Sequence, residues 1–149
     1  MIADPGLSET VGCLCLASRR AARAITREFD RELRPHGLRA TQFSLLAILE
    51  LKGPQSIGDL AHVLGADRTT LTRNLALVED QALVRSRPGD DARSRIIEIT
   101  PKGRSRLTGA FAAWRKTQSA LTASIGNEAV NSLRRLARSA PISSKAKEE

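Results

Sequence analysis

Residues 56–79 restrict the fold more than any other part of the chain, because they carry the signals of two short helices joined by a tight turn. Ser56 is a good N-cap residue, and Asp59 three positions later can complete a capping box. Gly65 can adopt the left-handed conformation that ends a helix. Asp67 is a good N-cap for a second helix. The apolar residues of this second helix form one narrow stripe, made by Leu71, Leu75 and Val78.

A β-hairpin is predicted directly after the second helix. Residues 83–87 and 95–99 have the composition of strands, and residues 88–94 between them are rich in turn-forming types. Two helices around a glycine turn, followed by a two-stranded ribbon, are the plan of a winged helix-turn-helix, whose second helix enters the major groove of duplex DNA. The expected fold class is therefore mainly α with a small β wing (α+β), and the expected partner is double-stranded DNA.

The second helix is polar over its first two turns, as a helix that reads bases must be. Threonine can contact a phosphate, a base edge or a thymine methyl group, arginine can read guanine through two hydrogen bonds, and asparagine can read adenine. An ordinary solvated helix face has the same composition, and the hairpin that follows favours the DNA-reading interpretation. The residues of this helix predicted to bind DNA are Arg68, Thr69, Thr70, Thr72, Arg73 and Asn74.

The predicted wing is basic along its strands and at its tip. Arg85, Arg87 and Arg95 lie on the strands and are expected to meet phosphates. Arg93 lies at the tip and is expected to enter the minor groove, where the negative potential is strongest over narrow A·T-rich stretches. Asp91 is expected to orient Arg93 or the recognition helix, because phosphate repels a carboxylate.

Amphipathic helices are predicted at both ends of the chain. One long helix is expected over residues 11–34, ending before Pro35, and Thr41 is expected to cap the next helix. Residues 100–101, a threonine followed by a proline, open another long helix, and the Gly-Asn pair at residues 126–127 breaks it before a last amphipathic helix.

Neither end of the chain can bury its apolar stripe alone. Residues 10–35 and 101–140 are therefore expected to form a helical dimerisation region, and residues 41–100 the winged helix-turn-helix, within a single domain of residues 1–149. A two-fold homodimer places two recognition helices about one turn of DNA apart, which suits a pseudo-palindromic operator. The alternative is a monomer in which the terminal helices form one compact cap.

These motifs resemble those of the MarR family of bacterial transcription regulators. The similarity covers about residues 10–140 in family order, and its most specific part is the wing sequence Asp-x-Arg at residues 91–93, followed by Thr-Pro-x-Gly at residues 100–103. Ala82 stands where the family usually has a glycine after the recognition helix. Either a left-handed alanine that costs about 1 kcal/mol or a different helix end is therefore expected. The other matching segments are residues 38–46, 57–61, 67–75 and 83–85.

The resemblance implies a homodimeric repressor that leaves DNA when a small molecule, often an anionic aromatic, lodges between the dimer helices and the winged helix. His36 and His62 are too few for the histidine-rich zinc sites of some relatives, so neither a metal nor another cofactor is expected. Four arginines are candidates to pair with an anionic effector, although solvated or ion-paired surface residues are the simpler interpretation: Arg19, Arg20, Arg23 and Arg39.

Cys13 and Cys15 offer a second way to sense a signal, since some members of the family detect oxidants, quinones or thiophilic metals through a cysteine in the first helix. Residues two apart in a helix point about 200° apart, and two thiols with a single residue between them in one helix are too close for a normal disulfide. Cys15 is expected to pack on the apolar seam with Val11 and Ile25. Cys13 is expected on the flank, where the positive end of the helix dipole favours a reactive thiolate. The peroxide sensors of the family bond their thiol to tyrosines, and this chain has no Tyr. The alternative is that the cysteines are ordinary small buried hydrophobes.

Composition fits a nucleic-acid partner. Lys and Arg number 24 against 16 Asp and Glu, and the net charge of +8 suits a polyanion. No catalytic triad, phosphate-binding loop or set of metal ligands is evident, so an enzyme is not expected. No apolar stretch is long enough to span a membrane and no signal peptide is recognisable, so a cytoplasmic location is expected. The rival interpretation is a winged helix that binds protein and has no effector.

Overall fold

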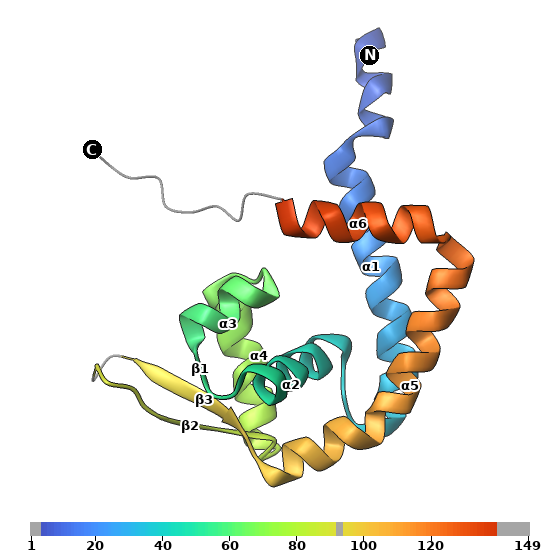
Figure 1. The fold of residues 1–149 in the computed structure, drawn as a ribbon. Helices are drawn as coiled ribbons and strands as arrows, with labels where there is room; N and C mark the ends of the chain where they lie inside the picture. Colours follow the sequence, from blue (N-terminus) through green and yellow to red (C-terminus); the bar gives the residue numbers. More distant parts are fainter. Residues whose placement is uncertain (1–3, 92–93, 140–149) are drawn as a thin grey trace, which may run out of the picture.

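The computed structural model describes residues 4–91 and 94–139 of the 149-residue chain. Figure 1 shows two parts: α1, α5 and α6 come from the ends of the chain, and α2, α3, α4 and a small sheet lie between them in sequence. In chain order the elements are η1 (Pro5–Gly12), α1 (Leu14–Leu33), η2 (Arg34–His36), α2 (Ala40–Lys52), β1 (Gln55–Ser56), α3 (Ile57–Leu64), α4 (Arg68–Asp80), β2 (Val84–Pro88), β3 (Arg95–Ile99), α5 (Pro101–Ile125) and α6 (Asn127–Ser139).

The wing belongs to a three-stranded antiparallel sheet with the strand order β1-β3-β2. β2 and β3 form the hairpin expected from the sequence, with Val84 opposite Ile99. The expectation of two strands was incomplete, because β1 pairs with the other edge of β3 and places Gln55 opposite Ile97. A two-residue strand has no periodicity of its own, so only its partner reveals it. This pairing fixes the start of α3 against the wing.

The helix-turn-helix has the caps that the sequence predicts. Ser56 Oγ accepts the N–H of Asp59 (3.1 Å) and donates to its carboxylate (2.7 Å). Gly65 ends α3 in the left-handed region with φ 60°. Asp67 caps α4 by accepting the N–H of Thr70 (2.8 Å). The stripe of α4 is confirmed as core, since all three of its members are buried: Leu71, Leu75 and Val78.

α4 ends in a Schellman motif around Ala82. The N–H of Ala82 donates to the Glu79 carbonyl (2.8 Å), and the N–H of Leu83 donates to the Val78 carbonyl (2.9 Å). Ala82 has φ 57°, so the strained left-handed alanine is the alternative that the structure confirms.

The expected cap of α2 was wrong. The helix begins at Ala40, one residue before Thr41, and other side chains satisfy its first N–H groups. Gln42 Oε1 accepts the N–H of Arg39 (3.0 Å), and Asp30 Oδ1 from α1 accepts the N–H of Ala40 (2.7 Å). The second acceptor comes from a helix packed against α2, which a local sequence pattern cannot show.

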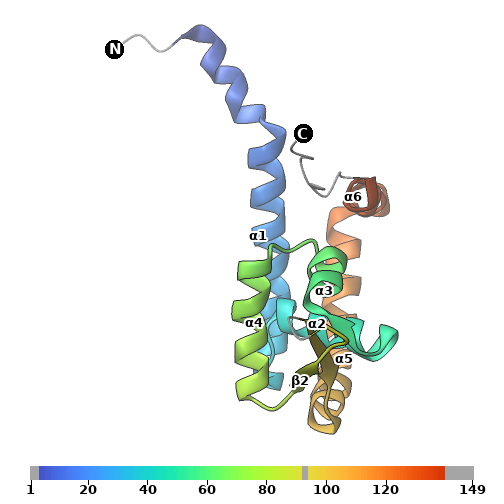
Figure 2. The same ribbon diagram turned by 90° about the vertical axis from the view of Figure 1, so that its left-hand side faces the viewer.

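The single long N-terminal helix was also wrong at its start. A 3-10 helix ends at Gly12, Cys13 is extended with φ −56° and ψ 124°, and α1 begins at Leu14. Gly12 lies at the break, which fits the high cost of glycine in a helix. Figure 2 shows η1 and the first turns of α1 projecting beyond the rest of the molecule.

α5 contacts the winged-helix part through its first turn and through Trp114, the only tryptophan in the sequence. Thr100 Oγ1 caps the helix by accepting the N–H of Gly103 (3.0 Å), as the sequence predicts. Gly103 is buried against Leu83, the residue before β2, and a Cβ there would overlap the carbonyl oxygen of Leu83. Further along, Trp114 stacks on Phe43 of α2 with ring centroids 5.7 Å apart.

Candidate nucleic-acid interface

The N-terminal half of α4 carries the polar residues expected to read DNA. Arg68, Thr69 and Thr72 are exposed. Thr72 Oγ1 donates to the carbonyl of Arg68 (2.7 Å), and Thr70 Oγ1 donates to the carboxylate of Asp67 (2.7 Å). Both hydroxyl protons are held locally, so each of these threonines presents an acceptor oxygen and a methyl group to a partner.

Asp67 fixes the first turn of this helix. Its carboxylate accepts the backbone N–H and the hydroxyl of Thr70, and these bonds lower the pKa of Asp67 below its usual value near 3.8. The cap therefore stays ionised at neutral pH, and the threonines of the first turn keep one orientation.

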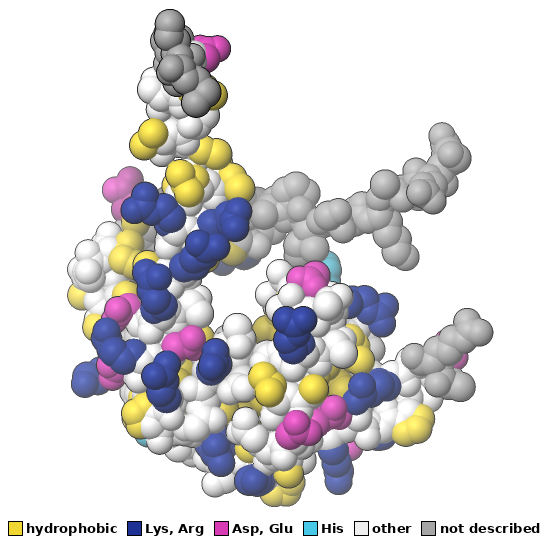
Figure 3. All heavy atoms as spheres, turned by 180° about the vertical axis from the view of Figure 1, so that it is seen from behind, with side chains coloured by type: hydrophobic (Ala, Val, Ile, Leu, Met, Phe, Trp, Pro, Cys, Tyr) yellow, Lys and Arg dark blue, Asp and Glu magenta, His cyan; other side chains and the backbone are white. Residues whose placement is uncertain are grey.

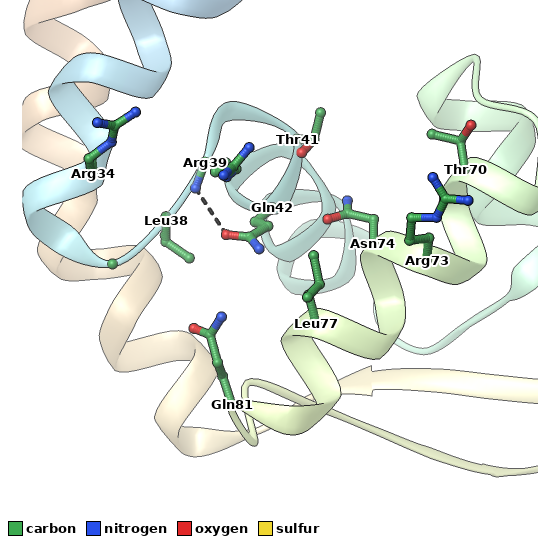
Figure 4. Close-up of a pocket in the computed structure, with 11 residues that line it drawn as sticks. Arg34, Leu38, Arg39, Thr41, Gln42, Thr70, Arg73, Asn74, Leu77 and Gln81 are labelled. Atoms are coloured by element: carbon green, nitrogen blue, oxygen red, sulfur yellow. Dashed lines mark hydrogen bonds between the residues drawn. The ribbon is translucent and has the colours of Figure 1, made fainter.

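One face of α4 borders a cleft of about 670 Å³ beside the start of α2. Figure 4 shows Asn74 and Leu77 reaching from α4 towards Gln42 across this cleft, and Arg73 directed towards Thr70. Asn74 is half-buried rather than fully exposed. The structure therefore divides the polar residues of α4 between an outer face and a cleft-facing side, a division that the sequence does not reveal.

Two of the three strand arginines of the wing form ion pairs within the protein. Arg85 Nε lies 2.8 Å from Glu98, and Arg95 Nη2 lies 2.9 Å from Glu79 of α4. Ser86 Oγ also donates to Glu79 (2.6 Å). The antiparallel register places Arg85 opposite Glu98, and this is a signal that the sequence analysis missed.

The tip of the wing is described only in part. Arg87 is exposed on β2. Asp91 is exposed, and its carbonyl accepts the N–H (2.8 Å) and hydroxyl (2.8 Å) of Ser94, which closes the turn. Arg93, predicted to enter the minor groove, lies outside the described residues.

A second cavity of about 320 Å³ lies between α1 and the winged-helix part. Its wall is mostly apolar, with Ile25 and Phe29 from α1 opposite Leu64 and Leu71. Arg39 lines the cleft beside α4 instead, and the other candidate arginines line neither space: Arg19, Arg20 and Arg23.

Cys13 and Cys15 are both free thiols, and both are exposed. Cys13 precedes α1, so the angular separation expected for two residues of one helix does not apply. Cys15 has no apolar seam to pack into within a single chain, because its side chain is exposed and Val11 is 81% exposed.

Two features are absent from residues 4–91 and 94–139. No group of three or more His, Cys, Asp or Glu side chains is placed to hold a metal ion in that part of the chain. None of its helices is both long and apolar enough to cross a membrane.

A capped helix-turn-helix with an exposed polar second helix and an adjacent β-ribbon defines a winged-helix DNA-binding protein. The model of the MarR family matches residues 38–94. The transcriptional regulator MosR of M. tuberculosis, crystallised in complex with DNA, is 43% identical, with a TM-score of 0.77 over 86% of this chain and 96% of MosR. The chain belongs to the MarR family, and it is a DNA-binding transcriptional regulator rather than an enzyme.

Two further relatives are more distant. The structure of the transcriptional repressor CouR, bound to a 23-mer DNA duplex, is 26% identical, with a TM-score of 0.72 over 93% of this chain and 96% of CouR. The HTH-type transcriptional regulator YwoH of Bacillus subtilis (strain 168) is 28% identical over 87 residues. That match spans 58% of this chain and 64% of YwoH.

Proposed function

We propose that this regulator binds a pseudo-palindromic operator in duplex DNA as a homodimer and represses transcription until an effector releases it. The observation that carries the proposal is the exposed polar face of α4, which lies beside a wing fixed to the same helix by Glu79 and Arg95. The DNA complexes of MosR and CouR, and the description of CouR as a repressor, support it.

The dimer is inferred from apolar side chains at the two ends of the chain. In a single chain they remain open to water, and Figure 3 shows hydrophobic side chains gathered on the N-terminal segment. A second copy packed on residues 10–35 and 101–140 would cover them. The exposed apolar residues of these regions are Val11, Leu14, Leu16, Phe111, Ile125, Leu133 and Leu136, and Leu7 lies just before them.

The molar mass from light scattering at micromolar concentration tests whether the protein is a dimer. We expect a dimer for the wild type and a monomer for Leu133→Asp, because a carboxylate would be buried in the interface. Leu51→Asp is the matched control, since Leu51 is 83% exposed at the end of α2, outside both terminal regions. A stable wild-type monomer would contradict the proposal.

We assign base reading to Arg73, which has no ion-pair partner within the described part of the chain. Fluorescence anisotropy should compare a duplex that the protein selects from a randomised pool with a random duplex of equal length. Arg73→Ala should cost about 1–3 kcal/mol on the selected duplex and flatten the preference at one base pair. Arg87→Ala, expected at a phosphate, should weaken both duplexes alike. Equal losses on both duplexes for Arg73→Ala would reassign Arg73 to phosphate.

For the effector we propose a small aromatic anion held in the cavity between α1 and the winged-helix part. Three residues line both this cavity and the cleft beside α4, namely Thr41, Thr70 and Asn74. A ligand in the cavity would therefore contact the recognition helix α4 on the side that faces α1. Benzoate and larger aromatic carboxylates should raise the melting temperature and release DNA, and Ser44→Phe, which fills the cavity, should abolish both effects. Release that persists in Ser44→Phe would contradict this site.

The alternative effector is a thiol-reactive compound acting at Cys13, which is favoured by its exposure at the break before α1. The Cys13 thiolate would attack one oxygen of hydrogen peroxide and break the O–O bond, which gives a sulfenic acid. The other peroxide oxygen would leave as hydroxide, which a proton converts to water. Peroxide should then release DNA from the wild type and from Cys15→Ser, whereas Cys13→Ser should stay bound. Release at the same dose in Cys13→Ser would make the thiol a bystander.

A further inference from the structure

The cleft beside α4 has two walls, and only one of them belongs to the recognition helix. On the α4 side, residues at helical spacing line it from Thr70 through Arg73 to Gln81. The opposite wall comes from η2 and the start of α2, and Figure 4 shows Arg34 and Arg39 there. The two arginines come from outside the helix-turn-helix, and the sequence pattern of that motif does not include them.

The charge of this cleft is positive and uncompensated. Among the residues that the structure describes, its lining contains Arg34, Arg39 and Arg73 but no Asp or Glu. Within the part of the chain that the structure describes, the ion-paired arginines are others: Arg31, Arg85, Arg95 and Arg104. Two arginines of the wing strands, Arg85 and Arg95, thus have carboxylate partners, whereas no carboxylate among the described residues lines the cleft. An anion is therefore the ligand that this wall favours.

The backbone that carries the two arginines is held firmly. Gly37 turns the chain with φ 72°, its N–H donates to the Arg34 carbonyl (2.9 Å), and its own carbonyl accepts from Arg106 of α5 (3.3 Å). Leu38 next to it is 2% exposed, and buried Gln42 accepts the N–H of Arg39 (3.0 Å). Both arginine side chains are exposed, so they extend from a fixed frame into the cleft.

We propose that Arg34 and Arg39 bind phosphates of the DNA strand that borders the major groove occupied by α4. This inference rests on the proposed function. A helix in the major groove is flanked by a sugar-phosphate strand on each side. The cleft lies along one flank of α4, and its lining combines Arg34 and Arg39 with Arg73 of the recognition helix. Phosphate contacts carry no sequence information, so this wall sets the affinity of α4 and its register in the groove.

The test measures Kd by anisotropy between 50 and 300 mM salt (about the range in which phosphate contacts dominate the change), on the selected duplex and on the random duplex. The variants are Arg34→Gln, Arg39→Gln and the charge-preserving Arg39→Lys. Arg104→Gln is the matched control, because it removes the same charge from an arginine paired with Glu50 outside the cleft. Thermal melts confirm that each variant is folded.

We expect Arg34→Gln and Arg39→Gln each to weaken binding about tenfold on both duplexes. Each should also lower the slope of log K against log salt by about two, because a dimer loses two phosphate contacts. Arg39→Lys should keep most of the slope, and Arg104→Gln should match the wild type. A wild-type slope in both Gln variants would overturn the inference, but the proposed function as an operator-binding regulator would still stand. A loss confined to the selected duplex would show base reading instead of phosphate binding. If the wild type does not prefer the selected duplex, the proposed function itself fails.

Discussion

The guanidinium of Arg95 in the wing is bound by Glu79 of the recognition helix, with Nη2 2.9 and 3.1 Å from the two carboxylate oxygens and 2.7 Å from Ser86 Oγ. The three residues come from three consecutive elements, β3, α4 and β2. Arg95 therefore links the wing to the recognition helix α4. An arginine expected at a phosphate is already a positioning residue in the free protein.

We predict that Glu79 and Arg95 are energetically coupled. In a double-mutant cycle with Glu79→Ala and Arg95→Ala, the coupling in the free energy of unfolding should be about 0.5–1 kcal/mol. The value is modest because the Arg95 side chain is 46% exposed and the Glu79 side chain 26% exposed, so water screens the pair. Urea unfolding measures it, and strictly additive single effects would show that the contact carries no energy.

Ala82→Gly should stabilise the protein by about 0.5–1 kcal/mol, because glycine adopts the left-handed conformation without a Cβ penalty. Ala76→Gly is the matched control: Ala76 lies exposed inside α4, where the same substitution should destabilise by about 1 kcal/mol. Chemical denaturation of both variants should give opposite signs. A loss of stability in Ala82→Gly would mean that φ at this position is not strained.

Gly103→Ala should destabilise the protein by about 1–3 kcal/mol through overpacking. The new methyl group would overlap the carbonyl oxygen of Leu83 and lie 2.8 Å from Ile99 Cγ1, so α5 would be pushed away from Leu83 and the end of β3. Gly109→Ala in the same helix meets nothing within 4 Å and should be neutral or stabilising. Trp114 fluorescence reports both transitions, and equal midpoints would contradict the close approach.

Acid should weaken the cap of α4. Because hydrogen bonds from Thr70 lower the pKa of Asp67, its stabilising effect is complete above the usual value near 3.8 and is lost as the pH falls through the lowered pKa. Asp67→Asn keeps a capping side chain but cannot titrate. The stability difference between wild type and Asp67→Asn should therefore shrink from pH 6 to pH 2 (about the window of carboxylate titration). A constant difference would contradict the assignment.

Arg93→Ala should weaken DNA binding, with the larger loss on duplexes that have A·T-rich flanks. This prediction rests on the place of Arg93 at the tip of the wing in the sequence, since the residue lies outside the described part of the chain. Anisotropy on duplexes that differ only in their flanks is the measurement. Losses that do not depend on flank composition would place Arg93 at a phosphate instead of in the minor groove.

The sequence by itself determined the helix-turn-helix, because its signals act over three or four residues. The caps at Ser56, Asp67 and Thr100 and the turn at Gly65 all lie where the local pattern puts them. The strain at Ala82 was also visible locally, as an alanine in the place of a glycine. Patterns of this kind depend on backbone groups close in the chain, so no tertiary contact is needed to recognise them.

Only the tertiary structure decided which polar residues are free to meet DNA. Asp30 caps α2 from 10 residues away, and Glu79 binds Arg95 from 16 residues away. The arginines of the wing and of the cleft look alike in sequence, but carboxylates brought close by the fold neutralise Arg95 and not Arg39. Charge compensation depends on distance in space, and that distance is set by how α1, α2, α4 and the sheet pack.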